Sequence, residues 1–182
     1  GASDILEIFS IYGQQSGTAG YSQELSRALI EFPINVVSAS RAAGDIPVSG
    51  NVSFYLKLYN ASHSRTMPSD YILTVSPISR SWTEGIGLDM EGYSDSDYAN
   101  WLSASSTQRW STPGGDYHTG TYTAGATLPS YDVHFPSGDE DLDVSVTHLV
   151  EEWLAGYAGL PAGGARDHYG VGIHLTASQE AY

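Results

Sequence analysis

Apolar and polar residues alternate along residues 51–59, and this two-residue period constrains the fold more than any other feature of the chain. Val52, Phe54, Leu56 and Leu58 occupy every second position. Side chains of a β-strand point alternately to its two faces, so the pattern predicts a strand with one buried face. Segments rich in β-branched and aromatic residues predict further strands over residues 4–12, 26–32, 71–79, 120–123, 131–135 and 169–175.

Proline and glycine mark the limits of several of these strands. Pro33 has no backbone donor and is predicted to end the strand that precedes it, and Pro77 is expected to place the end of its strand at a sheet edge or a bulge. Residues 13–23, which are dominated by Gly, Gln, Ser and Thr, are predicted to form a loop. In the last strand apolar residues alternate with glycines such as Gly172, which predicts that another part of the molecule packs closely on that face.

Two segments depart from the strand pattern. Apolar residues at helical spacing predict one short amphipathic helix over about 147–155, with Thr147 as its N-cap and Gly156 as its stop. Its solvent face is expected to hold His148, Glu151 and Glu152. Residues 81–117 show no sustained period, so a long inserted loop is predicted there, and a loop of this length is usually functional or folded on its own terms.

Composition narrows the class of protein. The 182 residues form most economically one domain, residues 1–182, and the abundance of Gly and Tyr beside little Lys favours an all-β chain. With 7 Lys and Arg against 21 Asp and Glu, the net charge of -14 argues against a nucleic-acid partner, since that affinity comes mainly from cations. No apolar run approaches the roughly 20 residues that cross a bilayer, so no membrane partner is expected. There is no Cys, which excludes disulfides and thiolate chemistry.

The sequence does not predict an enzyme. It contains no G-x-S-x-G elbow, no H-E-x-x-H and no phosphate-binding glycine loop. Glu84 with Asp89, or Glu151 with Glu152, could serve as a glycosidase pair, but such pairs also arise by chance in so acidic a chain.

Carboxylates on two turns suggest a structural Ca²⁺ as the one cofactor to consider. Hard cations prefer oxygen ligands on flexible turns, although neither run has EF-hand spacing, and solvated turn residues are the alternative. The candidate ligands are Asp95, Asp97, Asp139, Asp141 and Asp143.

Aromatic residues gather in and around the predicted insertion. They could stack on sugar rings or anchor a protein interface, or they could pin the insertion to the rest of the domain. The candidates for contact with a partner or a glycan are Trp82, Tyr93, Tyr98, Trp101, Trp110 and Tyr117.

Several motifs in order resemble the DNRLRE-type family of secreted and virion β-sandwich domains. The early strand reads SRALIEF, where that family has R-x-L-h-x-F with h apolar, and the next strand reads VSFYLKLYNA. The insertion contains SWTEGIGLDMEGYSDSDYANW and RWSTPGGDY, similar to a W-x-E-G-x-G-x-D segment followed by N-W and G-G-D. The last two motifs are similar to the family's helix and its final strand. They read DVSVTHLVEEWLAG and YGVGIHLTAS.

This resemblance implies a jelly-roll-type antiparallel β-sandwich that belongs to the particle of a tailed bacteriophage. The expected function is structural, as a capsid decoration or cement protein or another exposed head, neck or tail component. Expected partners are other virion proteins and further copies of the chain in a homo-oligomer, and the expected location is the virion, assembled in the host cytoplasm. The alternative is a carbohydrate-binding module that adheres to host-surface glycans. No catalytic residues come with the resemblance.

Overall fold

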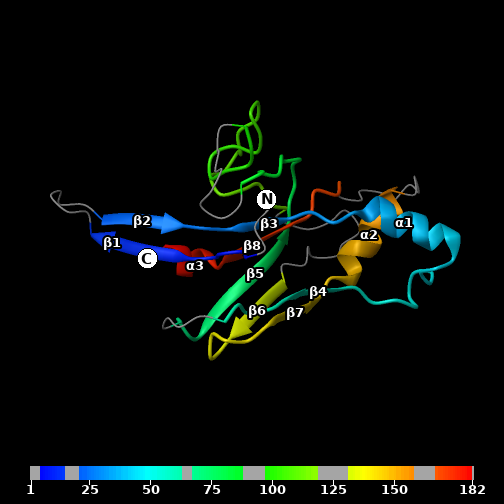
Figure 1. Ribbon diagram of the computed structural model, residues 1–182, viewed down its shortest axis with the longest axis horizontal. Helices are drawn as coiled ribbons and strands as arrows, with labels where there is room; N and C mark the ends of the chain where they lie inside the picture. Colours follow the sequence, from blue (N-terminus) through cyan, green and yellow to red (C-terminus); the bar gives the residue numbers. More distant parts are fainter. Residues whose placement is uncertain are drawn as a thin grey trace.

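The structure of the chain is a computed structural model, which describes residues 5–14, 21–62, 67–87, 97–118, 131–157 and 167–181. Antiparallel strands with a few short helices make up the regular structure, as Figure 1 shows, which confirms the prediction of an all-β chain. The described residues contain no helix that is long and apolar enough to cross a membrane.

A four-stranded antiparallel sheet forms the centre of the molecule, with the order β3-β8-β5-β6. β3 covers Ala28–Ile30, β5 covers Tyr71–Pro77, β6 covers Tyr131–Phe135 and β8 covers Val171–Leu175. The last strand of the chain therefore lies in the interior of the sheet, where it pairs with β3 through Leu29 and Gly172 and with β5 through Ser76 and Gly172. This register places Leu29, Gly172 and Ser76 side by side on one face of the sheet.

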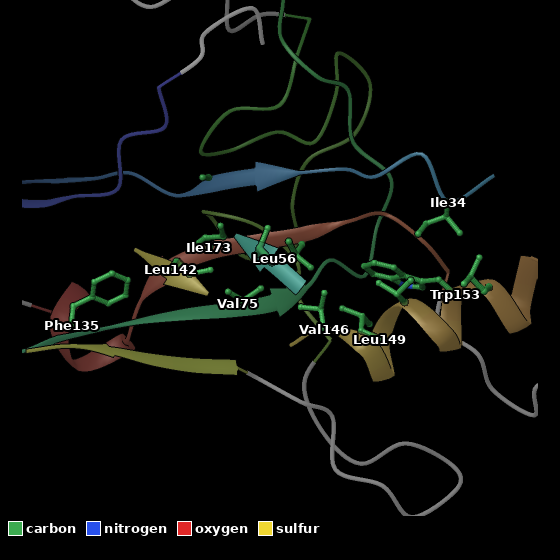
Figure 2. Close-up of a cluster of buried hydrophobic side chains, with 13 residues drawn as sticks. Ile34, Leu56, Val75, Phe135, Leu142, Val146, Leu149, Trp153 and Ile173 are labelled. Atoms are coloured by element: carbon green, nitrogen blue, oxygen red, sulfur yellow. The ribbon is translucent and has the colours of Figure 1, made fainter. Parts of the chain in front are cut away.

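A separate two-stranded pair joins β4 (Tyr55–Leu58) to β7 (Leu142–Ser145). The alternation predicted for the first of these strands is confirmed, because Leu56 is buried while Tyr55 and Lys57 are exposed. Leu56 and Leu142 from this pair meet Val75 and Ile173 from the central sheet in the main hydrophobic core (Figure 2).

Two helices close one end of this core. α1 (Ile34–Ala43) and α2 (Thr147–Tyr157) pack against each other, and Ile34 and Trp153 are both buried in the cluster that Figure 2 shows. The Arg41 guanidinium binds the Glu151 carboxylate through two hydrogen bonds of 2.7 Å each, which links the two helices. A further short helix, α3 (Ala177–Glu180), follows β8.

Helix α1 was not predicted from the sequence. Pro33 stands at its N-cap, where a missing backbone donor costs nothing, and Gly44 follows its end with a φ of 87°, a left-handed conformation that glycine adopts freely. Proline before a segment and glycine after it is a helix signal, so the information was present in the chain.

The predicted helix near residue 147 exists, but three details of its prediction are wrong. Val150 N donates to Val146 O, so the N-cap position belongs to Val146, and the Thr147 hydroxyl instead accepts a hydrogen bond of 2.8 Å from the backbone of Phe54. Gly156 lies inside the helix, which ends at Tyr157. Glu152 is buried rather than solvent-facing, with 9% of its surface exposed.

The strand prediction over residues 131–135 is confirmed with the same limits, and those over residues 26–32, 51–59, 71–79 and 169–175 are confirmed with shorter limits. The prediction over residues 120–123 lies outside the described residues. Pro77 ends its strand as expected, but β5 is an interior strand rather than an edge. Strand β7 was missed because its apolar residues alternate with aspartates that also suggested a cation site.

A hairpin of β1 (Ser10–Gln14) and β2 (Tyr21–Leu25) forms a third sheet of two strands. The predicted strand over residues 4–12 is regular only in its last part, and the predicted loop over residues 13–23 is wrong at both ends, where these strands run. Figure 1 shows the hairpin extending away from the central sheet. At its base Ser26 donates from its backbone to Phe9 O and from its hydroxyl to Glu7 O.

Candidate functional site

The insertion packs on the face of the central sheet that is turned away from the main core. A second hydrophobic cluster forms there around Ile78, Ala104 and Trp110, which are all buried. The partly buried residues that complete it are Leu29, Trp82, Ala99, Tyr117 and Tyr169. Ala28 belongs to the main core and Leu29 to this second cluster, so β3 is buried on both faces. The insertion therefore forms a second layer on the central sheet.

Two of the candidate tryptophans use their polar atoms inside this layer. The Trp82 indole N–H donates to Tyr169 O at 2.9 Å, and the Trp110 indole N–H donates to Asn100 O at 2.8 Å. Trp110 is only 6% exposed, so its ring is not available to a partner or a glycan. This arrangement is the one expected if the tryptophans pin the insertion to the domain.

The insertion is held by its own backbone pairing as well. Thr83 N donates to Ala104 O, and Ala99 N donates to Thr83 O, both within 2.9 Å. The Asn100 side-chain oxygen accepts hydrogen bonds from the backbone of Leu102 and Ser103. These bonds give the described part of the insertion a defined backbone conformation although it has no sustained strand or helix.

Tyr117 makes the closest contact between the insertion and the sheet. A methyl group on Gly172 would lie 2.3 Å from Tyr117 Cε1, so the tyrosine ring lies directly on the glycine, which is the close approach expected for this strand. The Tyr117 hydroxyl donates to Gly114 O at 2.9 Å, and burial raises the pKa of Tyr117. The Tyr117 ring therefore joins the insertion to the sheet, and part of the ring remains exposed.

Arg27 connects this layer to the end of the chain. Its guanidinium lies 5.1 Å from the centre of the Trp101 ring and 5.7 Å from that of the Tyr117 ring, within the range of cation–π attraction. Its Nε donates to the Glu180 carboxylate at 2.8 Å. Trp101 remains partly exposed, and Tyr98, also partly buried, packs beside Gly85.

An open hollow of about 440 Å³ lies between the insertion and residues that flank strands β3 and β5. Its lining combines two arginines with one carboxylate, hydroxyl groups and one aromatic ring, contributed by Arg27, Arg80, Asp116, Ser79, Ser111, Thr112 and Tyr117. Sequence reasoning named only the tyrosine among these. The sequence P-G-G-D, which ends at Asp116, marks a turn that could have drawn attention to this aspartate. Nothing local in the sequence indicates that Arg27 and Arg80 lie at the same hollow.

Asp116 organises one wall of this hollow. Its carboxylate accepts backbone hydrogen bonds from Ser111 at 3.0 Å and Thr112 at 2.9 Å, and Arg80 Nε lies 3.2 Å from it. Partial burial raises the pKa of Asp116, but the backbone donors and the charge of Arg80 outweigh burial and lower the pKa below its usual value. The wall is thus a fixed set of polar groups whose charges largely cancel.

The predicted cation ligands do not converge within the described residues. Asp141 accepts a hydrogen bond from the Asn60 backbone, and Asp143 lies 2.7 Å from Lys57 Nζ. Asp139 and Asp97 are exposed, Asp95 lies outside the described residues, and in the described part no three acidic or histidine side chains form a group that could hold a metal. Glu140 closes the turn by accepting hydrogen bonds from the backbone of residues 137 and 138.

The remaining candidates have the following positions. Glu151 belongs to the ion pair with Arg41, whose hydrogen bonds are the main reason that the pKa of Glu151 is lowered. Glu84 is exposed, while Asp89 and Tyr93 lie outside the described residues. Glu151 and Glu152 are adjacent in helix α2, where Glu151 is bound to Arg41 and Glu152 is buried.

Comparisons of the chain with protein-family models, with curated protein sequences and with solved structures found no match. The projecting hairpin, the aromatic layer and the polar hollow are the structural features that bear on the function of the chain.

Proposed function

We propose that this chain is a structural protein of a tailed-bacteriophage particle, with a jelly-roll-type β-sandwich as its fold. The resemblance of its motifs to virion β-sandwich domains supports this role, and a capsid decoration or cement function is favoured over a tail position. A sheet that carries a packed layer on each face supports a sandwich-like architecture.

The β1–β2 hairpin is the observation that carries the proposed role. It extends from the body as a two-stranded sheet of its own, and a single hairpin of this size is at best marginally stable in water. Ile5, Leu6 and Ile11 in and next to it are about half exposed, at 53%, 49% and 50%. Among the described residues no third strand pairs with this hairpin, and an arm with open strand edges and exposed apolar residues is suited to contact a neighbouring protein.

Co-sedimentation tests this proposal. The purified chain is mixed with isolated heads and with isolated tails of tailed phages, and the particles are pelleted. We expect saturable binding to heads, and a shortened variant that lacks the hairpin but still unfolds cooperatively should bind less. A chain that stays in the supernatant with every particle at all concentrations would contradict the proposal.

A carbohydrate-binding module is the second candidate, because the hollow offers hydroxyl groups and one aromatic ring in a charge-balanced wall. Arg27 is matched by Glu180 and Arg80 by Asp116, which favours a neutral, hydroxyl-rich ligand over a phosphate. A glycan array should then show binding that is lost in Thr112→Trp, which fills the hollow. Thr107→Trp, at an exposed position outside its lining, serves as the matched control. Absence of binding by the unmodified chain would remove this candidate.

A further inference from the structure

The longest stretch of the chain without a charged residue includes all of β1 and the first three residues of β2, and Glu24 of β2, opposite Ile11, is the first charged residue after it. Residues 8–23 contain no Asp, Glu, Lys or Arg, whereas the whole chain carries 28 such residues and a net charge of -14. Ser10–Gln14, the strand β1, lies entirely within this stretch. In a strongly acidic protein, two copies repel each other least where a surface without charges separates their charged bodies.

The free edge of β1 also lacks the usual features that prevent strands from pairing between molecules. Exposed edge strands in soluble proteins generally carry Lys, Pro or a bulge. β1 has the sequence SIYGQ and pairs residue by residue with β2, from Ser10 opposite Leu25 to Gln14 opposite Tyr21, without a bulge. In the described part of the chain neither strand of the hairpin pairs with a third strand.

We infer that β1 is the self-association edge of this protein, where it pairs antiparallel with β1 of a second copy about a two-fold axis. An antiparallel pair of identical strands is what a two-fold axis produces, and such an interface closes on itself as a dimer. The pairing converts two marginal hairpins into one sheet with the order β2-β1-β1-β2. This inference names the partner of the hairpin on which the proposed function rests.

The dependence of self-association on salt follows from the same charges. Each body carries the net negative charge of the chain, so the two bodies repel each other even though the paired strands do not. Added salt screens this repulsion over about 8 Å at physiological ionic strength. Dimerisation should therefore become stronger from low to moderate salt, opposite to an interface held by ion pairs.

Sedimentation equilibrium of the purified chain tests the inference. We expect a monomer–dimer equilibrium that Ile11→Lys weakens by at least about tenfold in Kd. Ile11 is 50% exposed, so the change should leave the fold intact, and Ile86→Lys at an equally apolar position that is 70% exposed is the matched control. Circular dichroism of both variants checks that they fold alike.

A cysteine cross-link tests the register directly, because the chain has no Cys of its own. Facing residues in an antiparallel pair have Cα atoms about 4.5–5.5 Å apart, which a disulfide can bridge. With the axis at the middle of β1, Tyr12→Cys should form a covalent dimer on mild oxidation, whereas Tyr55→Cys on the exposed face of β4 should not.

The inference is overturned if the unmodified chain stays monomeric at about 100 μM, a concentration at which a dimer with a Kd in the low micromolar range would be largely formed. It is also overturned if Ile11→Lys dimerises as well as Ile86→Lys does. The proposed function is assayed separately by co-sedimentation. A monomeric chain that still binds phage heads would contradict this inference and leave the proposed virion role in place.

Discussion

Replacing Gly172 with alanine should detach the insertion from the sheet by a steric clash. The new methyl carbon would lie 2.3 Å from Tyr117 Cε1, about 1.2 Å closer than the ~3.5 Å of an ordinary carbon contact. Gly172 cannot move away, since Leu29 and Ser76 flank it on the neighbouring strands. The ring is itself held by its hydrogen bond to Gly114. Overpacking of this kind costs about 1–3 kcal/mol.

A loss of about 2 kcal/mol should lower the melting temperature by roughly 4–8 °C in a domain of this size. Thermal unfolding followed by circular dichroism measures this shift. Gly85→Ala is the matched control, because its methyl group would lie 3.8 Å from the nearest atom, Tyr98 Cβ, and should leave the melting temperature unchanged.

A double-mutant cycle separates the clash from any other effect of the alanine. In a Tyr117→Ala background the added methyl group has no ring to meet, so Gly172→Ala should cost little there. The steric explanation fails if Gly172→Ala behaves like Gly85→Ala, or if it lowers the free energy of unfolding equally in both backgrounds.

Three further results are expected. Trp110→Ala should lower the free energy of unfolding in urea by about 3–5 kcal/mol, and Trp101→Ala by clearly less because that ring is partly exposed; equal losses would contradict the burial difference. Burial lowers the pKa of His174 below 6.5, so the unfolded state takes up a proton first and stability should fall as the pH drops below 6.5. His174→Gln should flatten that part of a pH–melting curve, and an unchanged slope would exclude His174 as its cause. Because Asp143 is paired with Lys57, millimolar Ca²⁺ should raise the melting temperature no more than Mg²⁺ does in the same scan, and a Ca²⁺-specific rise would restore the cation site.

The strands with clear alternation were predictable because their periodicity records one buried face. Leu56 and its neighbours show this in β4, whereas β8 is buried on both faces, and its glycines predicted the close contact that Tyr117 makes with Gly172. The register between Ala28 and Ile173 was not predictable, since nothing local in either strand specifies a partner so distant along the chain.

The candidate site was predictable only in part for a similar reason. The tryptophans of the insertion were recognisable, but a segment without a period does not indicate which rings turn inward, so the burial of Trp110 came from the structure alone. Arg27 and Arg80 belong to different segments and meet at the hollow only through the fold. Glu152 was expected at the surface because the apolar periodicity of the helix leaves it outside the predicted buried face, yet it is buried in the folded chain.

The position of β8 inside the central sheet has a consequence for the order of folding. β3 comes early in the chain but finds its sheet partner only when Val171–Leu175 has been synthesised, because β8 separates it from β5. Contacts between residues so far apart in sequence carry a large loop-closure cost and slow the folding of a domain. A nascent chain on the ribosome can therefore pair β5 with β6 while β3 is still unpaired, exposed to chaperones and to its own apolar neighbours.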